Sequence, residues 1–304
     1  MTLAAALLAL GVLAAGTDAP AAVQTLGPRA RAGVRRVVTL APSLTETVLA
    51  LDAGGLLVGV SRFDERKEVQ ALPRVGGFVD PSVEAVAGLK PDLVLVQPGP
   101  GNQRPVEALA GMGIPVIALR LGSVDDVLAA LRAVGMALGR AERGEALARA
   151  LERTRSEVRA RARGLPAVRV LFAYGFEPLV VAGPGSFADE LLRDAGGVNV
   201  AADAGRAYPV WSVERALGAR AEVVLYSPEM VAGRETLSGL PGLREARWVK
   251  LPSPALLHPG PALGVGLEEL FRALHPDASG AAARDAGRPA AVSGGTERSG
   301  EVAR

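Results

Sequence analysis

The sequence contains no cysteine, and this absence alone excludes several kinds of chemistry. Without thiols the chain forms no disulfide, offers no thiol nucleophile and builds no zinc–thiolate site. We also expect no lipid anchor of the bacterial lipoprotein kind, because that anchor needs a cysteine. Only two histidines occur, and neither lies in a recognisable motif, so we predict no metal site and no catalytic residues.

Aromatic residues, and charge of one sign, are also scarce. Aromatics make up 4% of the 304 residues while 49% are hydrophobic, so a large core is available. The 34 basic residues nearly balance the 32 acidic ones, and no basic stripe with interleaved aromatics occurs, which argues against a nucleic-acid partner. Neither a Gly-x-Gly-x-x-Gly motif nor a P-loop is present, so the nucleotide signal is weak.

An apolar run opens the sequence, from Met1 to Ala15. It has the length of a signal-peptide core and is too short to span a bilayer. Small residues at 14–16 and 19–21 offer a cleavage site. We therefore expect a signal peptide and a periplasmic protein. No later run is long and apolar enough for a transmembrane helix.

Beyond this run, short β-branched segments alternate with helical segments. Strands are predicted at 36–40, 58–60, 93–96, 116–119, 168–172 and 222–226. Helix starts are predicted at a capping box over Ser43–Glu46, at Asp80 as an N-cap, and at Ser123 and Ser186. Strands that alternate with helices in this way predict parallel sheets with right-handed crossovers.

A proline-free run of helix formers occupies 141–164. Leu151 and Val158 fall on one side of it at helical spacing, and Gly164 and Pro166 end it. As one helix it would extend about 35 Å. A helix of this length between two α/β units acts as a stiff strut.

The most informative pattern is an internal repeat. Residues 81–96 and 211–226 both run from helix through turn to strand, and each has Ser-Val-Glu at its helix start. Glu84 and Glu214, which occupy equivalent places, are 130 residues apart. Two similar lobes would leave a cleft between them, and parallel sheets bind ligands beyond the carboxyl ends of their strands.

The predicted fold is therefore α/β, with two Rossmann-like lobes of parallel sheet joined by a single long α-helix. The expected divisions are a signal peptide at 1–21, a linker at 22–35, an N-terminal α/β lobe at 36–138, the interlobe helix at 139–164, a C-terminal α/β lobe at 165–275 and a disordered tail at 276–304.

The few aromatics fall at informative places. Phe63, Phe78, Tyr174 and Tyr208 all lie in predicted loops after strands or before helices. Such positions favour apolar walls for a large, flat ligand, with ordinary loop packing as the alternative. Trp211 is expected to pack at a helix start.

Glu84 and Glu214 have two interpretations. The helix dipole favours an acidic residue in a first turn by roughly 0.3–1 kcal/mol, so either glutamate alone carries little meaning. At equivalent places on two lobes, however, they form a matched pair of charges for a two-fold partner that presents arginines.

Taken together, these segments resemble the helical-backbone (class III) periplasmic solute-binding proteins of ABC importers. The motifs that carry the resemblance are Arg36–Glu46, Val58–Phe63, Pro73–Phe78, Leu89–Val94 and Pro259–Pro261. They lie within about residues 35 to 275. The chain is most similar to the cobalamin (vitamin B12) binders of that family, and heme and iron–siderophore binders share much of the first motif set.

The resemblance implies a binding protein without turnover or cofactor, and a monomer that delivers cobalamin or a related tetrapyrrole to an ABC permease dimer with its ATPase. Its implied ligand contacts are Phe63, Phe78, Tyr174 and Tyr208, with Gln97 in place of a family tryptophan. Late polar contacts of the family fall near Pro254 and His258, where this sequence departs from it. His258 would coordinate a metal of the ligand, donate to an amide, or lie in solvent. Glu84 and Glu214 match the family's docking glutamates.

Two other classes stay open from sequence alone. One is a two-lobed α/β enzyme of nucleotide or cofactor metabolism, which the missing phosphate motifs disfavour. The other is a surface sensor that binds a ligand and reports to a receptor without transport.

Overall fold

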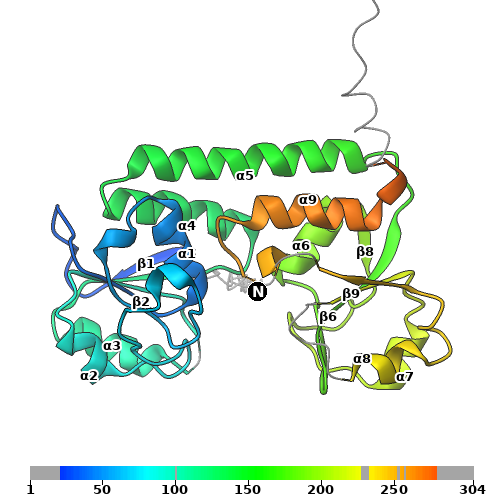
Figure 1. Cartoon of the computed structure of the whole chain (residues 1–304), viewed down its shortest axis with the longest axis horizontal. Coiled ribbons are helices and arrows are strands. Elements are labelled where there is room, and N and C mark those ends of the chain that lie inside the picture. Colours follow the sequence, from blue (N-terminus) through cyan, green and yellow to red (C-terminus); the bar gives the residue numbers. More distant parts are fainter. Residues whose placement is uncertain (1–20, 100, 227–232, 252–253, 257, 279–304) are drawn as a thin grey trace, which may run out of the picture.

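The computed structural model describes residues 21–278 apart from 100, 227–232, 252–253 and 257. Two α/β lobes lie side by side beneath one long helix, α5 (Ala141–Ala162) (Figure 1). This confirms the predicted fold class. Nearly all of the predicted signal peptide, and the predicted tail beyond 278, lie outside the described residues.

The N-terminal lobe is a five-stranded sheet in the order β1-β5-β4-β2-β3. Its strands are β1 (Val23–Leu26), β2 (Val37–Thr39), β3 (Leu57–Gly59), β4 (Leu93–Val96) and β5 (Val116–Leu119). Its helices are α1 (Pro42–Ala50), α2 (Val83–Gly88), α3 (Gln103–Gly111) and α4 (Val124–Ala137), with short 3-10 turns η1 (Gly54–Leu56) and η2 (Lys67–Val69). Strands β2 to β5 are parallel, and β1 is antiparallel to β5.

Strand β1 corrects the prediction of a linker over 22–35. Val23 and Leu26 are half-buried while the two residues between them are exposed. The segment pairs with the outer edge of β5, where its backbone groups hydrogen-bond with a strand edge that would otherwise be unpaired. Four residues are too few to show a strand period in the sequence.

The C-terminal lobe is built around β6 (Val168–Phe176), the longest strand. Its other strands are β7 (Leu179–Val181), β8 (Gly197–Asn199), β9 (Val223–Tyr226) and β10 (Arg247–Lys250). β6 pairs in parallel with β8 and β9, and antiparallel with β7. Its helices are α6 (Phe187–Asp194), α7 (Val213–Gly218), α8 (Arg234–Ser238) and α9 (Leu263–Leu274), with the 3-10 turn η3 (Pro254–Leu256).

The internal repeat reappears in the hydrogen bonds of the two lobes. The Nε of Arg36, beside β2, donates to the carbonyl of Lys90 (3.2 Å), and the Nε of Arg169, in β6, donates to the carbonyl of Arg220 (3.0 Å). Lys90 and Arg220 both have left-handed backbones, with φ of 46° and 50°. Non-glycine residues rarely adopt that conformation, so the same arginine contact supports the same strained turn in each lobe.

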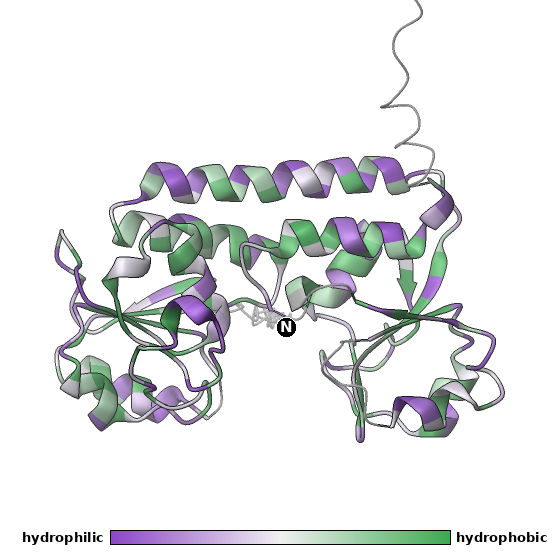
Figure 2. Ribbon diagram, viewed as in Figure 1, coloured by the Kyte–Doolittle hydropathy of each residue, from purple (hydrophilic) through white to green (hydrophobic). Residues whose placement is uncertain are grey.

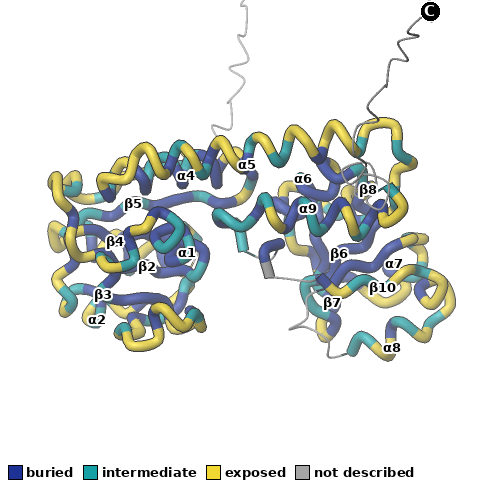
Figure 3. The backbone as a smooth tube through the Cα atoms, turned by 45° about the horizontal axis from the view of Figure 1, so that its top comes forward, coloured by how far each residue is buried: buried dark blue, intermediate teal, exposed yellow. Residues whose placement is uncertain are grey.

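Helix α5 lies across both lobes, antiparallel to α4 and parallel to α9. Arg132 of α4 pairs with Glu145 (2.7 Å), and Arg161 near the other end of α5 pairs with Glu268 of α9 (2.5 Å). Hydrophilic residues predominate along α5, while the strands below are mostly hydrophobic (Figure 2). Its outward side is exposed (Figure 3), whereas Leu151 and Val158 are buried, as their spacing predicts. Within the described residues, no helix has both the length and the apolarity to cross a membrane.

Two of the four predicted helix starts are confirmed and a third is wrong. Ser123 forms a full capping box at the start of α4, and Ser186 caps α6. Asp80 does not cap α2, because that helix begins later and Ser82 is its N-cap. Asp80 instead pairs with Arg62 (2.8 Å).

The capping box predicted over Ser43–Glu46 is also wrong. Helix α1 begins at Pro42, whose fixed φ suits the first helical position, and no side chain caps it. Ser43 therefore lies inside the first turn, and Glu46 is too far along the helix to reach back to its start. Its carboxylate pairs with Arg66 instead (2.8 Å).

The crossing of α4 and α5 depends on two glycines. A methyl group added at Gly144 would lie 2.6 Å from the carbonyl oxygen of Leu131, and one at Gly135 would lie 3.0 Å from the Cα of Gly144. The helix backbones therefore approach closely only because neither residue has a side chain.

We expect Gly144→Ala to destabilise the protein by about 1–3 kcal/mol, because the added methyl group forces α4 and α5 apart. Gly111→Ala is the matched control, since Gly111 ends helix α3 with open space around its missing side chain. That change should be neutral or slightly stabilising. Urea unfolding of the two variants tests the difference, and equal midpoints would contradict the close-packing argument.

Candidate functional site

The first group of predicted site residues lies on loops at the carboxyl ends of β3 and β4. Asn102, which is 1% exposed, ties these loops together. Its Nδ2 donates to the carbonyls of Phe78 and Gln97 (both 2.8 Å), and its Oδ1 accepts from the amide of Gly99 (3.0 Å). Sequence analysis missed Asn102, because its partners come from two separate loops.

Phe63 is 55% exposed, yet its ring is held in place. The guanidinium of Arg62 lies 4.8 Å from the ring centre, and Arg62 is itself fixed by its ion pair with Asp80. A methyl group at Gly77 would come within 2.8 Å of the Phe63 ring, so the ring packs against bare backbone. Phe63 is therefore an exposed aromatic side chain with a supported position, and its contact with a ligand stays a prediction.

The second group lies in the C-terminal lobe, where the structure brings Tyr174 and Tyr208 together. Their rings meet edge to face with centroids 5.4 Å apart, and Phe172 lies 5.0 Å behind Tyr174. Tyr208 is 49% exposed. The pair forms an aromatic wall whose outer member faces solvent.

Tyr174 carries an unusual hydroxyl group. The oxygen is buried and has no hydrogen-bond partner among the described residues. Burial, with a smaller contribution from Tyr208, raises the pKa of Tyr174 well above its ordinary value, so the group is neutral. An unpaired buried hydroxyl costs about 1–3 kcal/mol, and a polar group on a ligand would remove that cost.

The two groups of candidate aromatics, Phe63 with Phe78 and Tyr174 with Tyr208, belong to different lobes. Within the described part of the chain, no ring contact joins Phe63 or Phe78 to the two tyrosines. His258 is half-buried in the segment between η3 and α9. The remaining candidates thus come from several elements, and their placement as one site stays a prediction.

Neither a described pocket nor a metal cluster adds to this set. A pocket of about 440 Å³ lies in the N-terminal lobe between β1 and α3, with Leu26, Gln103 and Arg120 in its lining. None of the six predicted ligand contacts lines it. Among the described residues, no group of three or more His, Asp or Glu side chains could hold a metal ion.

Glu84 and Glu214 occupy matching positions. Each is exposed in the first turn of a short helix whose N-cap is a serine, Ser82 in α2 and Ser212 in α7. Both helices lie on the side of the lobes remote from α5 (Figure 1). The pKa of Glu214 is lowered by the backbone amide of Glu214 itself and by the Ser212 hydroxyl, so this carboxylate stays charged.

Trp211 packs at the start of α7, as expected. It is 5% exposed, and the guanidinium of Arg215 lies 4.6 Å from its ring centre. It belongs to the core of the C-terminal lobe.

The sequence model of one family, described as "Periplasmic binding protein", matches residues 37–254. The chain belongs to this family. The match spans α5 and most of both lobes. It includes the loops of the four candidate aromatics and the helices α2 and α7 that carry the two glutamates. It confirms the resemblance derived from the sequence motifs.

The individual relatives are named for two kinds of ligand. A vitamin B12-binding protein of Salmonella paratyphi A is 31% identical over 191 residues, which cover 62% of this chain and 71% of that protein. A periplasmic heme-binding protein of Roseiflexus sp. RS-1 is 31% identical, with a TM-score of 0.71 over 81% of this chain and 100% of its own. The vitamin B12-binding protein of Vibrio cholerae shares the fold, with a TM-score of 0.71 at 24% identity over 81% of this chain and 98% of its own.

We expect Tyr174→Phe to leave the free energy of unfolding unchanged or slightly raised, because it removes a buried polar group that has no partner. Tyr226→Phe is the control, since the Tyr226 hydroxyl accepts from Arg234 (3.2 Å). That change should cost about 0.5–1.5 kcal/mol. Thermal or urea unfolding measures both. A clear loss in Tyr174→Phe would mean that the hydroxyl has a partner in the free protein.

Proposed function

We propose that this chain is a periplasmic solute-binding protein that captures cobalamin between its two lobes and delivers it to an ABC permease. It is exported by the signal peptide at 1–21, acts as a monomer and performs no chemistry on its ligand. The observation that carries the ligand assignment is the 31% identity to a vitamin B12-binding protein, over 71% of that protein's length.

The arrangement of side chains supports a large, flat, partly polar ligand. Phe63 and Tyr208 are both about half exposed and are supplied by different lobes. Apolar rings facing each other across a gap would bury the faces of a corrin ring, which is among the largest biological ligands. The unpaired hydroxyl of Tyr174 would meet one of the amides at the corrin periphery.

Heme is the second candidate, and one observation favours it. The Roseiflexus heme-binding protein matches this chain at the same 31% identity and over a larger share of it. Tyr208 and His258 carry side chains that could coordinate iron. An iron–siderophore would also suit the family, but no aligned relative quoted above supports it.

We expect purified protein at micromolar concentration to bind cyanocobalamin saturably, as followed by tryptophan fluorescence. Phe63→Ala should weaken that binding about tenfold, because a central aromatic contact is lost. Met112→Ala is the control, since Met112 is equally exposed (60%) but has no proposed role. Binding of hemin without binding of cyanocobalamin would replace the cobalamin assignment with heme.

The pair Glu84 and Glu214 would dock on arginines of the permease dimer. We expect the double change Glu84→Ala/Glu214→Ala to abolish ligand uptake in reconstituted vesicles while leaving ligand affinity unchanged. Glu142→Ala/Glu157→Ala removes the same charge from the exposed side of α5 and should leave uptake intact. Lost ligand affinity in the first variant would contradict a docking role. Intact uptake in that variant would place docking elsewhere, whereas no uptake with the parent protein would favour a sensor.

A further inference from the structure

Helices α4 and α9, which belong to different lobes, begin close together beneath the middle of α5. Arg155 of α5 pairs with Asp125 in the first turn of α4 (3.1 Å). Gly264, in the first turn of α9, lies beside Leu151 and Thr154 of α5. Because α4 runs antiparallel to α5 and α9 runs parallel to it, their N-termini face each other across the lobe boundary. The first amides of a helix have no partner within the helix and carry a partial positive charge, so a carboxylate at either N-terminus is favourable.

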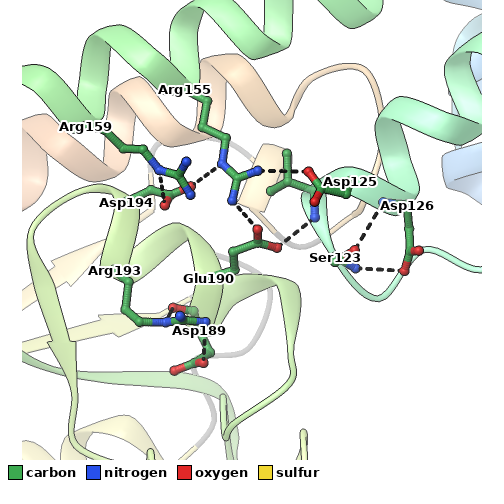
Figure 4. A network of polar contacts seen from close by, with 10 residues as sticks. Ser123, Asp125, Asp126, Arg155, Arg159, Asp189, Glu190, Arg193 and Asp194 are labelled. Atoms are coloured by element: carbon green, nitrogen blue, oxygen red, sulfur yellow. Dashed lines mark hydrogen bonds and ion pairs between the residues drawn. The ribbon is translucent and has the colours of Figure 1, made fainter. Parts of the chain in front are cut away.

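The N-terminus of α4, in the N-terminal lobe, receives a carboxylate from the C-terminal lobe (Figure 4). Glu190 of α6 accepts from the amide of Val124, the first residue of α4, at 2.8 Å. The other oxygen of Glu190 pairs with Arg155. Arg155 also pairs with Asp194 of α6 (2.6 Å), so this one guanidinium neutralises carboxylates from both lobes.

The N-terminus of α9, in the C-terminal lobe, receives a carboxylate from the N-terminal lobe. The carboxylate of Glu46 of α1 lies against the segment that leads into α9, and the amide of Ala262, the N-cap of α9, is among the groups that act on it. A methyl group at Gly260 would lie 3.4 Å from the same carboxylate, which shows how closely this segment lies on α1. Burial raises the pKa of Glu46, and the guanidinium of Arg66 and the Ala262 amide act in the opposite direction.

The two contacts are reciprocal. In each lobe the first helix, α1 or α6, sends a glutamate to the other lobe's helix beneath α5, which is α9 or α4. In each case an arginine pairs with the same glutamate, Arg66 with Glu46 and Arg155 with Glu190. Neither glutamate forms a cap for its own helix. A carboxylate that is partly buried and paired at both ends is held in one geometry, and it holds its two partners in that geometry as well.

We propose that Glu46 and Glu190 are positioning residues: a reciprocal pair of interlobe helix caps that fixes the angle between the lobes. They thereby set the separation between the loops of Phe63 and Phe78 in one lobe and the Tyr174–Tyr208 pair in the other, where the ligand would enter. The link to the ligand rests on the proposed function, whereas the lobe angle does not.

The absence of native cysteine allows a direct test. Spin labels at Gly88→Cys and Gly218→Cys would report the separation of the lobes, because both glycines are exposed at the ends of α2 and α7 with open space around them. Electron double resonance on the ligand-free protein should give one narrow distance distribution. Glu46→Gln and Glu190→Gln should each broaden it, and the double change should broaden it further. Glu157→Gln, on the exposed side of α5, should leave it unchanged.

A double variant whose distribution superimposes on that of the parent would overturn the proposal, provided that circular dichroism shows it to be folded. If the double variant does not fold, Glu46→Asp and Glu190→Asp carry the same test, since they keep the charge but shorten the reach. Unchanged distributions in both of these would overturn it equally. Adding cyanocobalamin separates the two ideas: failure of the parent to bind it refutes the ligand, but not the broadening seen without ligand.

Discussion

A largely buried guanidinium holds the boundary between the two lobes. Arg155 is only 11% exposed, and a charge in that position is tolerated only when carboxylates surround it. Asp125 comes from the N-terminal lobe, while Glu190 and Asp194 come from the C-terminal lobe. All three pairs form together only when both lobes are in place, which links the position of one lobe to that of the other.

The proposed ligand surface would take its geometry from that boundary. Each group of candidate residues is supported within its own lobe: Asn102 ties the loops of Phe78 and Gln97, and the ring of Phe172 packs against Tyr174. Two groups of residues on separate lobes have no fixed separation unless other contacts hold the lobes in place. The interlobe contacts and the single helix α5 supply it.

Periodic and local features of the fold were predictable, and contacts between remote elements were not. The internal repeat, the long helix and the serine N-caps at Ser123 and Ser186 depend on patterns of neighbouring residues, so the sequence reveals them. Asp80 and Glu46 look like helix caps locally, but arginines elsewhere in the chain take their carboxylates. Candidate aromatics could be found because they are rare. Asn102 could not, since its role appears only when two loops meet.

The buried side of α5 also affects the order in which a growing chain can complete its fold. Leu151 and Val158 are buried, and the C-terminal half of α5 packs on α6 and α9. Both of those helices follow α5 in the chain, and α9 ends at Leu274. A growing chain can thus close its first sheet and the α4–α5 hairpin early, yet it must leave half of α5 without its apolar cover. The strut reaches its final environment only when nearly all of the second lobe has been made.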